Sequence, residues 1–162
     1  MAFGMTGCNL DITMYDGVME EQFDNKNLLE LSQGSYRLLK NDGGLIDNGY
    51  YFWAFGADDV TWNGTSTGST FKLYDYSRNI ASSTTEYTWE LGYRVIGNCN
   101  KIIEIIQGLG NESTREQTIM MGENYYLRAL SYFLLVNEFA QPYSNNPTQT
   151  PGLPLKLSLI HI

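Results

Sequence analysis

Residues 83–139 carry two long stretches of helical periodicity, and this feature limits the chain to a largely helical fold. Ser83, followed three residues later by Glu86, has the form of a capping box, which opens an α-helix. Apolar and amide side chains then recur at helical spacing until Gly108 and Gly110 terminate the helix. The recurring positions are Trp89, Tyr93, Ile96, Asn100 and Ile103, flanked by Cys99, Ile102 and Ile106.

A second capping box, Ser113 to Glu116, opens another helix that extends to about Phe139, because Pro142 prevents much continuation. One side of this helix holds Ile119, Tyr126, Ala129, Leu130, Phe133 and Leu134. That side is widened by Tyr125, Arg128, Tyr132 and Leu135, so we expect the helix to be covered on more than one side. Two long helices joined by a short polar turn form an antiparallel hairpin. The pattern therefore predicts an all-α fold with the proportions of a tetratricopeptide-like repeat.

The region before this hairpin combines a shorter helix with a long loop. Residues 27–40 place four leucines and Ser35 on one helical face. Residues 41–70 carry six glycines among many Asn, Ser and Thr residues, a density of turn formers that predicts a loop. Residues 50–64 nevertheless hold six aromatic side chains, which argue against disorder. Since long ordered loops are often functional, we expect a ligand to bind at this aromatic-rich loop.

Charge and residue inventory exclude several classes of function. The net charge of −8 and a pI near 4.5 disfavour nucleic acid and anionic lipid headgroups as partners. Only Cys8, Cys99 and His161 are available for a Cys and His zinc site or for a histidine base, so we expect no metal, no cofactor and no catalysis. No stretch of the sequence reaches the roughly 18 to 20 apolar residues that span a bilayer.

Three segments carry a more specific pattern. They are WELGYRVIGNCNK at 89–101, GENYYLRALSYFLLVNEF at 122–139 and GLPL at 152–155. In composition, order and separation they resemble the N-terminal portion of the SusD/RagB family. The resemblance implies a lipid-anchored protein of the bacterial outer membrane, exposed at the cell surface. It also implies glycan binding without catalysis, and delivery of the glycan to a SusC-like TonB-dependent transporter for nutrient uptake.

The resemblance also implies where sugar would bind. In starch-binding members, aromatic rings and an amide from the loop between the first two helices form part of the site. Here that loop offers Trp53, Asp58, Asp59, Trp62 and Asn63 as glycan-binding candidates. Indole rings stack on the apolar faces of sugars, while amides and carboxylates bond to hydroxyl groups. The alternative is that the rings pack under the loop and the aspartates cap turns, and a calcium site at Asp58 and Asp59 is a weaker possibility.

The sequence predicts that the two ends of the chain are segments separate from the helical domain. Cys8 follows Thr6 and Gly7, as the lipid-modified cysteine of a bacterial lipoprotein follows small residues, although a full signal peptide is missing before it. We therefore expect a truncated leader and acidic tether at 1–26, a helical domain at 27–141 and a truncated Pro-rich tail at 142–162. The alternative for Cys8 is an ordinary unpaired cysteine.

A different class of function stays open at this point. A helical-repeat module could bind a protein segment in its grooves and no sugar. A glycan-degrading enzyme is disfavoured, because adjacent carboxylates such as Asp58 and Asp59 point in different directions and flank no defined cleft.

Overall fold

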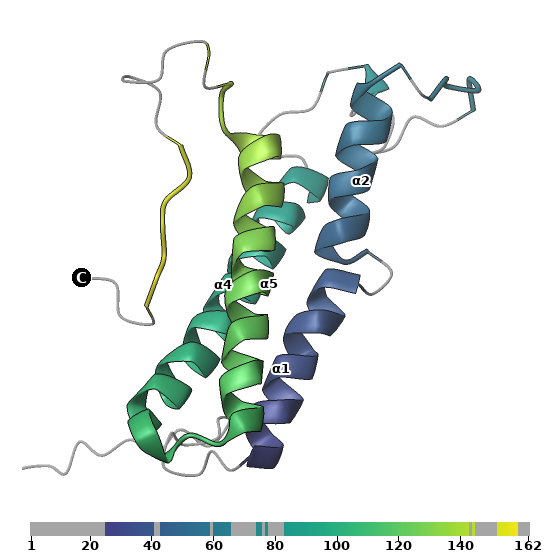
Figure 1. Ribbon diagram of the computed structural model, residues 1–162. Helices are drawn as coiled ribbons and strands as arrows, with labels where there is room; N and C mark the ends of the chain where they lie inside the picture. The colour runs from purple at the N-terminus through teal and green to yellow at the C-terminus, as the bar shows by residue number, and fades with distance from the viewer. Residues whose placement is uncertain are drawn as a thin grey trace, which may run out of the picture.

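In the computed structural model, the described residues are 25–40, 43–58, 60–65, 74–75, 77, 83–142, 144 and 152–158. Every regular element among them is helical, as the sequence predicts (Figure 1). Helix α4 (Ser83–Leu109) and helix α5 (Arg115–Phe139) form an antiparallel hairpin, joined through the short 3₁₀ helix η2 (Gly110–Glu112). Helices α1 (Asn25–Lys40) and α2 (Leu45–Gly56) follow one another along this hairpin (Figure 1), and each packs against both α4 and α5.

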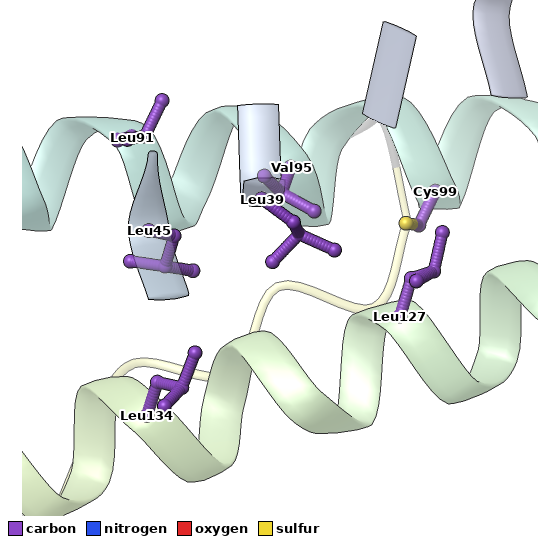
Figure 2. Close-up of a cluster of buried hydrophobic side chains, with 7 residues drawn as sticks. All are labelled: Leu39, Leu45, Leu91, Val95, Cys99, Leu127 and Leu134. Carbon is purple, nitrogen blue, oxygen red and sulfur yellow. The ribbon is translucent and has the colours of Figure 1, made fainter. Parts of the chain in front are cut away.

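The core lies where these helices meet. One buried cluster takes side chains from all four helices (Figure 2): Leu39, Leu45, Leu91, Val95, Cys99, Leu127 and Leu134. A second cluster closes the other end of α1 and α4 with Leu28, Ile102 and Ile106. Burial raises the pKa of the Cys99 thiol to about 11, although a hydrogen bond with Ser35 and the charge of Arg128 act in the opposite direction. The thiol is therefore protonated at neutral pH and packs as a small apolar group.

The expected loop at 41–70 is wrong over its first half, because residues 45–56 form helix α2. Packing explains the difference. Leu45 is fully buried, and the side-chain amide of Asn48 donates to the carbonyl of Gly43 at 2.9 Å. Gly49 is a packing residue and not a turn residue, since a Cβ there would lie 3.0 Å from Glu138 Oε1 on α5. Tertiary contacts thus override the low helix propensity of a glycine-containing segment.

The second capping box is displaced by one residue from the predicted Ser113 and Glu116. Thr114 is the N-cap of α5, and its Oγ1 accepts from the backbone N–H of Gln117 at 3.2 Å. Gln117 Oε1 accepts in return from the backbone N–H of Thr114 at 2.8 Å. Ser113 instead donates its hydroxyl to the carbonyl of Gly110 at 2.9 Å, which fixes the turn. The predicted end of the helix at Phe139 is confirmed.

The predicted inner side of α5 is also partly wrong. Ile119, Tyr126 and Phe133 are 53%, 65% and 56% exposed. The buried side is a different one, lined by Gln117, Asn124, Leu127, Ser131, Leu134 and Leu135. Because α5 carries apolar residues around most of its circumference, periodicity alone does not identify its inner face.

Candidate functional site

The residues predicted to bind sugar lie at the carboxyl end of α2 and just beyond it. Trp53 belongs to the last turn of α2 and is 45% exposed, while Trp62 follows in the segment 60–65 and is 40% exposed. Asp58 is exposed between them, and Asp59 lies outside the described residues. Figure 1 places this stretch at one end of the helical bundle. Both tryptophan side chains therefore keep part of their surface accessible.

Asn63 is held in a fixed conformation by its neighbours. Its Oδ1 accepts from the backbone N–H of Thr65 at 3.1 Å and from the Thr65 hydroxyl at 2.7 Å, which is the geometry of an Asx turn. Gly64 occupies the left-handed region between them with φ of 83°. With the carbonyl oxygen used in the turn, the exposed side chain offers its NH₂ group as the donor to a ligand.

A second surface was not identified from the sequence as a candidate site. In the sequence, the spacing of Trp89 and Tyr93 only indicates a helix face. In the structure the two residues lie one turn apart on α4, and their half-buried side chains line an open pocket. Their ring centroids are 4.9 Å apart. Phe139 meets Trp89 edge to face at 5.1 Å, and Tyr132 meets Tyr93 in the same manner at 6.4 Å. No local sequence pattern reveals this pocket, because its second wall comes from Pro154 and Lys156, about sixty residues after Tyr93 in the chain.

Residues 152–158, here called the strap, run in extended conformation along the α4–α5 hairpin (Figure 1). The Tyr93 hydroxyl donates to the carbonyl of Pro154 at 2.8 Å, and Asn100 Nδ2 donates to the carbonyl of Lys156 at 2.9 Å. The Tyr132 hydroxyl donates to that same carbonyl at 2.9 Å and accepts from the Lys156 N–H at 2.6 Å. These bonds fix the strap as one wall of the pocket.

Arg128 completes this network from α5. Its guanidinium donates to Asn100 Oδ1 at 2.7 Å and to the carbonyl of Leu157 at 3.4 Å. Arg128 and Asn100 therefore both connect the hairpin to the strap. Burial, with a smaller contribution from nearby Tyr132, raises the pKa of Tyr93, so its hydroxyl is protonated and can donate to the strap at neutral pH.

Metal and membrane features are limited in the described part of the chain. Its residues contain no cluster of three or more His, Cys, Asp or Glu side chains that could hold a metal ion. Among its helices, none has the length and apolar character required to cross a membrane. Cys8, the predicted lipid attachment residue, and His161 lie outside the described residues.

Comparison with known proteins decides the family. Residues 14–157 match a family described as starch-binding and associating with the outer membrane. The chain belongs to the SusD-like family. The SusD-like protein P25 of Formosa agariphila is 32% identical in an alignment of 123 residues. The alignment covers 70% of this chain and 23% of that relative. This SusD-like chain thus spans about a quarter of the relative's length. No solved structure was found to match it.

The family description names starch binding and association with the outer membrane. SusD-like proteins are binding proteins without a catalytic step, and the family is associated with the outer membrane. Trp53 and Trp62 at the end of α2, and the aromatic pocket beside the strap, are accordingly candidate binding surfaces.

Proposed function

We propose that this SusD-like chain binds a polysaccharide or oligosaccharide at the cell surface and delivers it to a SusC-like TonB-dependent transporter for uptake. The observation that carries the proposal is the family match over residues 14–157, whose description names starch binding at the outer membrane. The exposed rings of Trp53 and Trp62 support it, because they supply the flat apolar surface on which a pyranose stacks.

The proposed binding chemistry uses the segment at the end of α2. Trp62 stacks on one sugar face, and the NH₂ group of Asn63, oriented by the Asx turn with Thr65, donates to a sugar hydroxyl. Trp53 supplies a second ring, while Asp58 and Asp59 supply carboxylate acceptors for further hydroxyl groups. The net charge of −8 favours neutral glycans over sulfated or phosphorylated ones.

Calorimetric titration with neutral glycans, including soluble starch, tests the proposal. We expect a saturable heat for at least one glycan, and about a tenfold loss of affinity in the variant Trp62→Ala/Asn63→Ala, since a lost stacking contact and hydrogen bond amount to about 1.4 kcal/mol or more. Tyr126→Ala is the matched control, because Tyr126 is an exposed aromatic residue on α5 that belongs to neither candidate surface. Unchanged affinity in the double variant would exclude this site.

Attachment to the membrane is proposed to use a lipid on Cys8. Several acyl chains, each contributing about 0.8 kcal/mol per buried CH₂, make a firm anchor. Metabolic labelling of the native protein with a radioactive fatty acid should mark the wild type and not Cys8→Ala. An unlabelled wild type would rule out the anchor.

One observation favours a second candidate function, a helical module that binds protein. Ile119, Tyr126 and Phe133 are exposed at seven-residue steps along α5, a spacing that suits contact with another helix. If no glycan of the panel produces a heat, the glycan proposal fails, and protein binding by this side of α5 becomes the leading hypothesis.

A further inference from the structure

The pocket between α4 and the strap has the size and composition of a ligand site in its own right. Its volume is about 620 Å³, within the range of small-molecule pockets. Its walls come from the first turns of α4 and from the strap, and its lining residues are Glu86, Trp89, Glu90, Tyr93, Arg94, Pro154 and Lys156.

The floor of the pocket is aromatic and rigid. Trp89 and Tyr93 lie at 4.9 Å with an interplanar angle of 50°, and the edges of Phe139 and Tyr132 support them from α5. The Tyr93 hydroxyl donates to the carbonyl of Pro154, so the side chain cannot change its χ1 rotamer without breaking a bond to the strap. A fixed platform of this kind loses little entropy when a flat ligand stacks on it.

The rim of the pocket is polar but balanced in charge. Glu86 and Glu90 bring two carboxylates, while Arg94 and Lys156 bring two cations. Arg94 Nη1 lies 3.8 Å from Glu90 Oε1, and Lys156 Nζ lies 5.6 Å from the centre of the Tyr93 ring. A balanced rim offers hydrogen-bond donors and acceptors without a net field that selects an ion. It therefore suits a neutral ligand with many hydroxyl groups and an apolar face.

We propose that this pocket is a second saccharide subsite, separate from the surface at the end of α2. One or two neutral hexose units stack on Trp89, with Glu86 accepting from hydroxyl groups and Lys156 donating to them. The inference rests on the proposed glycan function and extends it. With this subsite, the chain could contact one long glycan at two places, or bind two glycans at once.

The three tryptophans of the chain allow each surface to be observed separately. Trp53 and Trp62 belong to the first surface and Trp89 to the pocket, so the three indole N–H signals of the ¹⁵N-labelled chain report on both. Trp53→Phe and Trp62→Phe assign their own signals by removal, which leaves Trp89 identified without any change in the pocket. The probe is a neutral linear glucose oligosaccharide of starch type.

On titration, we expect the Trp89 signal to shift in a saturable manner, both in the wild type and in Trp62→Ala/Asn63→Ala. In Glu86→Gln, half-saturation of the Trp89 shift should require about threefold more sugar, because a hydrogen bond to a charged group is weakened. Glu112→Gln is the matched control, since Glu112 is exposed on η2 outside the pocket lining.

The possible failures are distinct. If the Trp62 signal shifts and the Trp89 signal does not, the subsite is excluded while the glycan function stands. A Trp89 shift that disappears in Trp62→Ala/Asn63→Ala also excludes an independent subsite. If none of the three signals moves with the sugar, both proposals fail together.

Discussion

Gly92 and Leu135 meet where α4 packs on α5, and the contact leaves no room for a side chain at residue 92. A Cβ at Gly92 would lie 2.7 Å from both terminal carbons of Leu135 and 2.8 Å from its Cγ. Leu135 is fully buried and cannot move into solvent. At Gly97, on the same helix, a Cβ would meet nothing within 4 Å. Two glycines of one helix thus have opposite roles, and only the first sets the distance between helices.

Gly92→Ala should destabilise the chain by about 1–3 kcal/mol, because relief of the clash requires off-rotamer side chains or a shifted helix. Gly97→Ala should instead stabilise the chain by up to about 1 kcal/mol, since alanine has the higher helix propensity and no neighbour obstructs it. Urea denaturation followed by circular dichroism at the helical band measures both. Equal effects of the two substitutions would contradict this account of the helix contact.

At the level of elements, the sequence predicted α1, α4 and α5 among the helices that the structure describes and missed α2, and its errors have physical causes. Helices ending at Lys40 and Phe139, and one beginning at Ser83, agree with the structure, because turn formers or caps mark these boundaries. The sequence missed helix α2 because glycines suit turns as well as close packing. Only the contacts of Gly49 with Glu138 and Leu134 of α5, distant in sequence, distinguish the two. Asn124 is buried although it is polar, because its side-chain amide donates to the Ser32 hydroxyl of α1 at 3.1 Å. Apolar periodicity does not identify a buried position of this kind.

The displaced capping box provides a test of the α5 N-terminus. Thr114→Ala removes the acceptor for the Gln117 N–H, so the chain should lose about 1 kcal/mol of unfolding free energy. Ser113→Ala, the cap expected from the sequence, should have a smaller effect, because its hydroxyl bonds to Gly110 in the turn. Thermal unfolding of both variants separates the alternatives, and a larger loss for Ser113→Ala would favour the box predicted from sequence.

At the scale of the whole molecule, the candidate site was only partly accessible to sequence reasoning. The aromatic-rich loop indicated Trp53 and Trp62 as candidates, and the sequence left open whether their rings are accessible or packed under the loop. The pocket at Trp89 could not, because it exists only where the strap returns to α4 about sixty residues later in the chain. Long-range pairing of this kind leaves no local periodic signal.

Four helix side chains hold the main chain of the strap. Tyr93, Asn100, Tyr132 and Arg128 bond to carbonyl groups or to an N–H of the strap, and none of these bonds involves a strap side chain. These hydrogen bonds consequently do not depend on which side chains the strap carries. A substitution at Lys156 can therefore change the lining of the pocket while the helices still hold the backbone of the strap in place.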